Sequence, residues 1–515
     1  MSISETISSF ASGAVDWNRR PVALNHGIQK IAGVDKFEIA VCLPGTAVRT
    51  EFAASGSLQS KCSITARKHE AGEKKMTRWA RVPAVAAVAV LALATGCSSV
   101  TMETPKAAST PAKEKPFVAQ VVGLEWLNPL QRRDYPTEWQ LLWTMGLVKP
   151  NKNDDMVRTD PKSFNTVRPV AGIAYGNGGN ESLKGFYRKY ITTLLVLLHD
   201  RYSMNGHYFY IVQPSGKRHW RELAGIRVEL AIPARLSPQD ARSRLSDEMI
   251  TAFSIGSKSF PDLWSKDTPP DIQIHVGGAN AGFTSLNAAL DYLQAHPQES
   301  VWVMNWDAPS FPPKDEQMNE NLTVLFLAGP DLKTEREPLA WIGKAATGRV
   351  SDYEAKSGTT RAVQAWKATI AQAAHNANVD PSSIQFVVHD AGKGSDAASA
   401  RLASLSQTLT ETLPEFDYTK QVFNTPALLG DMGAGTALTN VALAIGRVNH
   451  FGGNALVAGT TDAGYPTAVV ILPPSKLTPI DPNGDWFRAR GENNAYLPWW
   501  GRRHDTNYGI QGYSY

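Results

Sequence analysis

The sequence predicts an α/β protein of two related halves, each with a mixed β-sheet and a buried central helix. One observation is an apolar run, a turn of small residues and an amphipathic helix, in that order, over residues 274–293. Another is that residues 336–478 repeat this alternation of helices and strands. The third is size, because 515 residues with 43% hydrophobic and 19% charged residues can bury more than one core.

The run over residues 274–293 is the centre of the first half. Small residues from Gly277 to Gly282 let the backbone approach a neighbouring segment closely. The helix that follows places its apolar residues on one face: Leu286, Ala289, Leu290 and Leu293. Free N–H groups and the positive dipole end of such a helix attract negative charge, which is where an acyl-transfer enzyme places its nucleophile. Asn280 occupies the turn instead, and an amide cannot form a thiolate.

Further elements follow in both halves. In the first half, strands are expected at residues 300–306 and 322–328. The second half is expected to contain a helix over 359–377, a strand over 384–388 that ends at His389, and a hairpin over 454–472. Asp431 precedes an apolar helix that runs through Ala444.

Several classes of function lack their residues. The three cysteines are Cys42, Cys62 and Cys97, so residues 98–515 contain no thiol and no cysteine metal ligand. Neither a Gly-x-Ser-x-Gly elbow nor a His-Glu-x-x-His pair occurs, so the chain is not expected to be a hydrolase with that elbow or a zinc protease. The net charge of +4 comes with no basic stripe, which argues against nucleic-acid binding. We therefore expect no metal and no cofactor.

The first 97 residues have the pattern of an export signal placed behind an extension. A basic segment from Met76, an apolar run over 82–94 and small residues before Cys97 are typical of a signal peptide. We expect translation to begin at Met76, with residues 1–75 a disordered or wrongly included upstream extension. The alternative is that Met1 is genuine and that residues 82–94 form a short buried or membrane-associated segment.

The end of the signal, residues 76–97, resembles a bacterial lipobox whose cysteine is lipidated after cleavage. Ala94 departs from the leucine usual three residues before that cysteine. Residues 98–115 are rich in Ser, Thr, Pro, Ala and Lys and are expected to form a flexible linker. A membrane-associated or periplasmic protein, anchored by lipid at Cys97, is the expected result, with a cytoplasmic protein as the alternative.

The central stretch resembles the nucleophile elbow of the thiolase and β-ketoacyl synthase superfamily. In that superfamily Ala-Cys-x-Gly opens a helix, and the corresponding residues here are Ala279-Asn280-Ala281-Gly282. An ordinary strand–turn–helix is the alternative for this stretch. By the same resemblance, His389 matches the first catalytic histidine, while Asp431 takes the place of the second.

The resemblance implies a degenerate site and a probable pseudoenzyme. The nucleophile is replaced at Asn280, and a carboxylate at Asp431 would oppose the oxyanion that the family stabilises. Without a nucleophile, His389 is expected to brace its loop, with catalysis as the alternative.

A second resemblance concerns a larger part of the chain. A strand over 117–126 precedes a helix that contains Pro136, Trp139 and Trp143. This passage resembles the type VI lipase adaptor proteins, formerly a domain of unknown function of Gram-negative bacteria. The resemblance implies adaptor halves at 116–335 and 336–478 and a thiolase-like fold. It also implies a non-catalytic role, namely binding a phospholipase effector and assisting its loading onto the type VI secretion spike.

The last residues, 479–515, combine aromatic and arginine side chains. Such residues are enriched where proteins bind one another. The candidates for partner binding are Trp499, Trp500, Arg502 and Arg503. The alternative is that these rings pack into the core.

Two functions from other classes compete with the adaptor. One is a thiolase-like acyl-transfer or acyl-hydrolysing enzyme with an atypical nucleophile, and the other is a structural periplasmic lipoprotein. The export signal and the adaptor role point in different directions, because a protein that loads a cytoplasmic spike works in the cytoplasm.

Overall fold

The computed structural model of the chain describes residues 38–43, 46–51, 115–127, 137–150, 152, 155–164, 182–198, 223–253, 255–256, 268–309, 319–333, 337–413 and 415–478. The chain divides into two units, Met1–Pro111 and Ala112–Tyr515. In the first unit, β1 (Glu38–Leu43) pairs antiparallel with β2 (Thr46–Glu51). The segment 76–97, the tail 479–515 and all but Lys115 of the expected linker lie outside the described residues.

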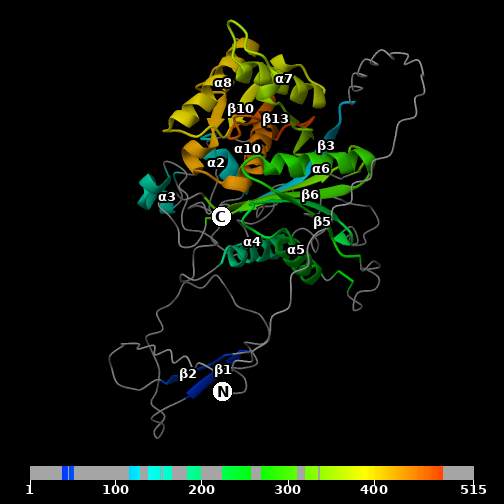
Figure 1. Ribbon diagram of the computed structural model, residues 1–515, viewed down its shortest axis with the longest axis vertical. Coiled ribbons are helices and arrows are strands. Elements are labelled where there is room, and N and C mark those ends of the chain that lie inside the picture. The colour runs from blue at the N-terminus through cyan, green and yellow to red at the C-terminus, as the bar shows by residue number, and fades with distance from the viewer. Residues whose placement is uncertain are drawn as a thin grey trace, which may run out of the picture. The chain divides into compact units, whose positions relative to one another are not determined.

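The second unit contains an alternation of helices and strands that occurs twice (Figure 1). The first series is β3 (Val118–Leu127), α2 (Thr137–Thr144), α3 (Asp155–Thr159), α4 (Leu183–Leu198), β4 (Arg227–Ile232), α5 (Pro238–Ala252), β5 (Asp271–Val276), α6 (Ala281–Ala295), β6 (Ser300–Asp307) and β7 (Asn321–Ala328). The second series is β8 (Ala340–Gly343), β9 (Ala346–Thr347), α7 (Arg361–Asn376), β10 (Ile384–His389), α8 (Asp396–Thr412), β11 (Val422–Asn424), α9 (Thr425–Leu429), α10 (Thr436–Phe451), β12 (Asn454–Gly459) and β13 (Thr467–Leu472).

The sheet shows that the two series are related. Its path runs β11-β10-β12-β13-β8-β3-β7-β6-β4-β5, and β9 pairs with β13 beside β8. From either end inward, three strands are parallel and the next two alternate in direction. If β8 and β9 count as one interrupted strand, each half places its third, second, fourth, fifth and first strands in that order. The predicted two related halves with mixed sheets are therefore confirmed.

Helices α6 and α10 lie at the centre of the second unit (Figure 1). They contact each other, while α6 packs on β4 and β6 and α10 packs on β12 and β7. Helices α7 and α8 cover the outer face near β10 and β13, and α4 and α5 lie on the opposite side near β5 (Figure 1). The arrangement confirms the predicted buried central helices and gives alternating layers of helices and strands.

Burial explains why these segments form their elements. Every residue of β6 and β7 is buried, and each strand contains an apolar run, 301–304 in β6 and 324–328 in β7, as expected when helices cover both faces of a sheet. Helix α10 is buried along almost its whole length and ends at Gly452, whose φ of 70° suits a glycine. Among the described residues, none of the helices combines the length and apolar character that a membrane span requires.

Candidate functional site at the N-termini of the central helices

The predicted elbow is a strand, a short turn and a helix. Strand β5 ends at Val276, and Asn280 is the residue that caps the N-terminus of α6. Asn280 has helical backbone angles, φ −88° and ψ −3°, and its side chain makes no capping hydrogen bond. Its Oδ1 atom is buried and has no hydrogen-bond partner among the described residues. The structure thus places Asn280 at the helix N-terminus, where the family resemblance put the missing nucleophile.

The end of strand β12 covers this helix terminus. A Cβ atom built on Gly459 would lie 2.4 Å from Asn280 Oδ1 and 2.8 Å from Phe283 Cε2. Only a residue without a side chain lets β12 approach α6 this closely. The space in front of Asn280 is therefore filled by the backbone of the second half.

An alanine at Gly459 should destabilise the protein. The new methyl group must displace Asn280 or Phe283, and such overpacking costs about 1 to 3 kcal/mol. Gly278→Ala is the matched control, because a Cβ atom there meets nothing within 4 Å. Urea unfolding of both variants measures the difference in stability. Equal unfolding midpoints would show that β12 and α6 are not in close contact at Gly459.

His389 lies at the end of β10 and is buried, with 2% of its surface exposed. Its Nδ1 accepts a hydrogen bond from the backbone N–H of Ala391 at 3.1 Å, so the ring proton resides on Nε2. Burial lowers the pKa of His389 to about 4, and the ring is neutral at pH 7. In register His389 is paired with Ala458, the neighbour of Gly459, so the strand ends bring His389 to the same region as Asn280.

The neighbouring Asp390 is a site residue that the sequence analysis missed. Its Oδ1 accepts from Thr460 N at 2.5 Å and Thr460 Oγ1 at 2.8 Å, and its Oδ2 accepts from Thr461 Oγ1 at 2.8 Å. Burial raises the pKa of Asp390, while these hydrogen bonds act in the opposite direction. The carboxyl group ties the end of β10 to the β12–β13 turn. A pair of threonines directly after a predicted strand was the available signal.

Asp431 differs from the buried His389 and Asp390 in its exposure. Its side chain is exposed, and its Oδ1 accepts from Gly433 N at 2.8 Å, which forms a local turn before α10. Its backbone oxygen accepts from Asn319 N at 2.5 Å. The carboxylate of Asp431 therefore shapes the turn into the 3₁₀ segment η6 (Gly433–Gly435).

Asp307, the last residue of β6, lies against η6, the 3₁₀ turn that leads into α10. Asp307 Oδ2 accepts from Ala434 N at 2.9 Å, and Arg235 donates to Asp307 Oδ1 at 2.5 Å. A carboxylate at a helix N-terminus is stabilised by the helix dipole. Burial raises the pKa of Asp307, and the Arg235 guanidinium opposes that rise. Both central helices thus begin against a strand end: α6 against β12 and α10 against β6.

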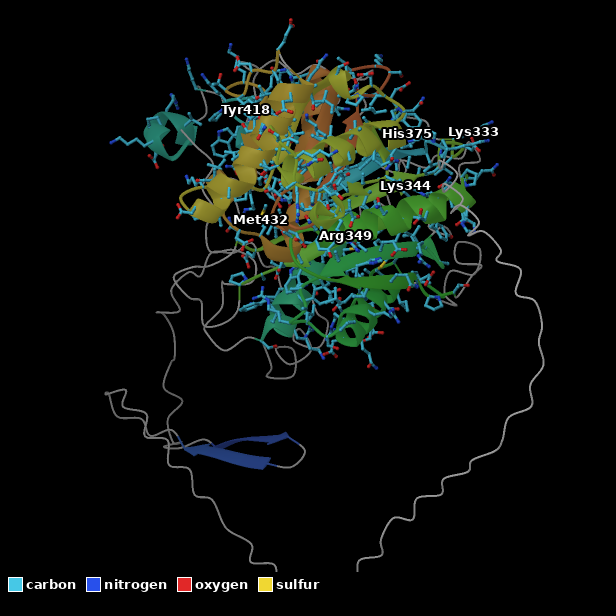
Figure 2. All side chains as sticks on the ribbon, turned by 45° about the horizontal axis from the view of Figure 1, so that its top comes forward. Lys333, Lys344, Arg349, His375, Tyr418 and Met432 are labelled. Carbon is cyan, nitrogen blue, oxygen red and sulfur yellow. The ribbon has the colours of Figure 1, made fainter. Side chains whose placement is uncertain are left out.

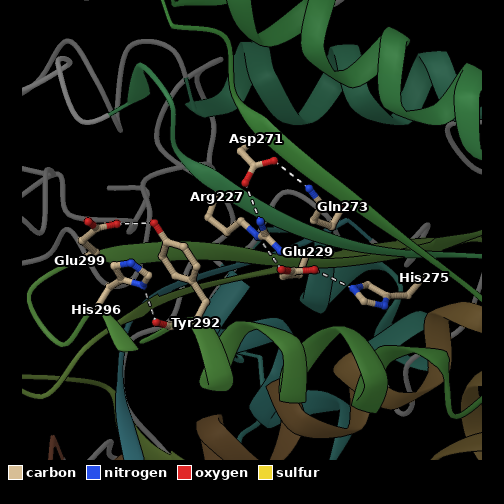
Figure 3. A network of polar contacts seen from close by, with 8 residues as sticks. All are labelled: Arg227, Glu229, Asp271, Gln273, His275, Tyr292, His296 and Glu299. Carbon is tan, nitrogen blue, oxygen red and sulfur yellow. Dashed lines mark hydrogen bonds and ion pairs between the residues drawn. The ribbon is translucent and has the colours of Figure 1, made fainter. Parts of the chain in front are cut away.

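A separate polar network lies on the β4–β5 side of the sheet (Figure 3). Glu229 is fully buried. Its Oε1 accepts a hydrogen bond from Arg227 Nε at 2.6 Å, and its Oε2 lies 2.6 Å from His275 Nε2. Arg227 also pairs with Asp271 at 2.5 Å and lies over the Tyr292 ring. The network joins the edge strand β5 to β4 and to α6. Charged groups along an edge strand also discourage pairing with other chains.

A cavity of about 760 Å³ lies between α6 and α7. Its lining includes Lys344 and Arg349, both labelled in Figure 2. The rest of the lining is mostly polar. Among the described residues, clusters of three or more metal-ligating side chains are absent.

Other predicted site residues cannot be placed. Trp499, Trp500, Arg502 and Arg503 lie outside the described residues, as does Cys97. Their roles in partner binding and lipid anchoring stay predictions.

Comparison with protein families bears on the second half. Residues 346–473 match the family model described as "Type VI lipase adapter protein Tla3, C-terminal". Over this segment, the chain is similar to a type VI lipase adaptor. The match extends from β9 to the end of β13 and confirms the resemblance predicted from the sequence. No curated protein sequence matches the chain.

Solved structures with similar folds are ketosynthases and thiolases. A ketosynthase domain of oxazolomycin synthesis from Streptomyces albus JA3453 is 13% identical, with a TM-score of 0.40, and covers 71% of this chain and 98% of its own. The 3-oxoacyl-(acyl carrier protein) synthase III of Pseudomonas aeruginosa PAO1 is 14% identical, with a TM-score of 0.38 and coverage of 70% and 100%. The peroxisomal 3-ketoacyl-CoA thiolase of Saccharomyces cerevisiae is 11% identical, with a TM-score of 0.38 and coverage of 58% and 95%. All three TM-scores are below 0.5, so the two-half arrangement rests on the strand order described above, and the likeness says nothing of activity.

Proposed function

We propose that the protein is a non-catalytic adaptor that binds a phospholipase effector and assists its loading onto the type VI secretion spike. The observation that carries the proposal is the match of residues 346–473 to the lipase adaptor family. The match itself names neither an effector nor a spike protein, so binding to these two partners is what we propose.

The chemistry at the start of α6 supports the non-catalytic part. Residues 98–515 contain no cysteine, and the residue at the helix N-terminus is Asn280. The nearby Ser285 is fully buried and its hydroxyl donates to Gly282 O at 3.0 Å, so it is not presented to a substrate. An acyl-transfer reaction needs an activated nucleophile within reach of a base, and this group of residues lacks that pairing.

Capture of partners tests the adaptor role. The tagged full chain, expressed in its own bacterium, should retain a phospholipase that is identified by mass spectrometry and by its lipase activity. Recovery of neither a phospholipase nor a spike protein would contradict the proposal.

A labelling experiment tests the absence of catalysis. We expect the purified chain to keep its mass after incubation with an acyl-thioester probe, because no thiolate stands at the helix terminus. A covalent adduct that maps to residues 277–285 would favour the acyl-transfer enzyme instead, and Ser285→Ala would show whether that hydroxyl carries it.

As the alternative to a cytoplasmic location, we propose that the chain is exported and anchored by lipid at Cys97, on the pattern of residues 76–97. Intact mass spectrometry of the endogenous protein should then find a lipid-modified chain that begins at Cys97. An unprocessed chain would refute export and favour a cytoplasmic adaptor.

A further inference from the structure

The cleft between α6 and α7 has a floor made of strand residues. The floor is the segment from Lys344 to Arg349, which contains β9. One extra residue in this segment, relative to β13, separates the register of β8 from that of β9. The lining consists of Asn287, Asp291, Lys344, Ala345, Ala346, Thr347, Gly348, Arg349, Asp352, Tyr353, Ala368, Thr369, Gln372, Asn376 and Tyr465.

The register shows which backbone groups face the cleft. Ala346 pairs with Ala468 and Thr347 with Thr467, and Gly348 N donates to Pro466 O at 2.8 Å. In an antiparallel pair, alternate residues direct their N–H and C=O groups toward the partner strand and away from it. Since Gly348 bonds to β13, the N–H and C=O of Thr347 point the other way, into the cleft.

The neighbouring backbone position shows what kind of group fits there. The backbone N–H of Ala345 donates to Asn287 Oδ1 at 2.7 Å, and its C=O accepts from Asn287 Nδ2 at 2.9 Å. The carboxamide of Asn287 thus satisfies both backbone groups of Ala345, which lies two positions before Thr347. Among the described residues, strand β3 does not continue the pairing, since its last partner on this side is Gly343. By this register the N–H and C=O of Thr347 are not bonded to β13, and Thr347 is exposed.

The side chains around the cleft are hydrophilic and balanced in charge. Lys344 pairs with Asp291 at 2.5 Å, and Arg349 lies over the Tyr465 ring. With Asp352, the lining contains two cations and two carboxylates. A strongly charged ligand is therefore not favoured, whereas an uncharged polar group such as a peptide unit is.

We propose that this cleft receives an extended, hydrophilic peptide segment of the lipase, whose main chain pairs with the N–H and C=O of Thr347. The inference rests on the proposed adaptor function and adds the binding surface. A main-chain amide is the same chemical group as the carboxamide that Asn287 presents to Ala345. Addition of a peptide to an open strand edge is a recurring mode of recognition. The family match, residues 346–473, includes β9, helix α7 and Tyr465, and so most of the cleft.

Two variants of the full chain test the proposal. Thr347→Pro removes the N–H that faces the cleft, and its control Thr347→Val keeps that N–H. Ala368→Trp fills the cleft from the exposed face of α7, and its control Ala400→Trp places the same ring on the exposed face of α8, which does not line the cleft. We expect the first member of each pair to bind the captured lipase at least about tenfold more weakly than the wild type, and the controls to bind as the wild type does.

The outcomes separate this inference from the adaptor role. If the wild type captures a lipase and all four variants bind it equally, the adaptor role stands and the cleft is refuted. If the wild type captures no lipase, both are refuted. Circular dichroism of each variant shows whether it is folded, and Ala368→Trp tests the cleft even if proline disturbs the strand.

Discussion

Replacing Asp307 with alanine lowers the free energy of unfolding by about 3 kcal/mol, because it leaves the buried backbone N–H groups of Ala308 and Ala434 without their acceptor and removes the ion pair with Arg235. Asp307 is 2% exposed, and its carboxylate accepts hydrogen bonds from Arg235 and from the backbone N–H of Ala434. The substitution therefore also removes the acceptor for the 3₁₀ turn η6, which leads into the buried central helix α10. Urea unfolding of the full chain, followed by tryptophan fluorescence, measures the loss.

An exposed ion pair serves as the control. Lys367 pairs with Glu411 on the outer surface of α7 and α8. Their side chains are 44% and 35% exposed. Lys367→Ala should cost at most about 1 kcal/mol. A similar loss in the two variants would show that Asp307 has no special role in starting α10.

The second large effect concerns pH and His389. Its folded pKa is about 4, well below the ordinary value of 6.5, because burial disfavours the charged ring. The unfolded chain therefore binds this proton first as pH falls, and stability present above pH 6.5 is lost between pH 6.5 and 4. The loss attributable to His389 is at most about 3 kcal/mol.

Comparison with a variant isolates that loss from the titration of carboxyl groups. Urea unfolding measured at about pH 7, 5.5 and 4.5 covers the expected window. Between the first and the last of these, the free energy of unfolding should fall less for His389→Gln than for the wild type. His296→Gln removes an exposed histidine and should follow the wild type. If His389→Gln and the wild type had the same slope against pH, the ring would not be held neutral by burial.

Local patterns were sufficient to predict most of the longer elements and their repetition, but not the short elements β8, β9, β11 and α9. The apolar runs of β6 and β7, the amphipathic helix α6 and the hairpin of β12 and β13 each follow from residues close in sequence. The position of Asn280 at the start of α6 followed from the same local pattern. The repeated order of elements also predicted two related halves.

Contacts between the halves could not be predicted in this way. Asp307 meets Ala434 across 127 residues of sequence, and Asp390 meets Thr460 across 70. The open edge at Thr347 depends on the register of β9 against β13 and on where β3 ends. Such features depend on long-range pairing, and a one-residue change in register would reverse which groups face the cleft.

The most direct test of the adaptor claim is native mass spectrometry of the purified full chain mixed with the phospholipase that it captures. Binding predicts a new species whose mass is the sum of one chain and one lipase, and the lipase should remain active within it. Two separate species at micromolar concentrations, with no complex mass, would contradict the claim that this protein is a lipase adaptor.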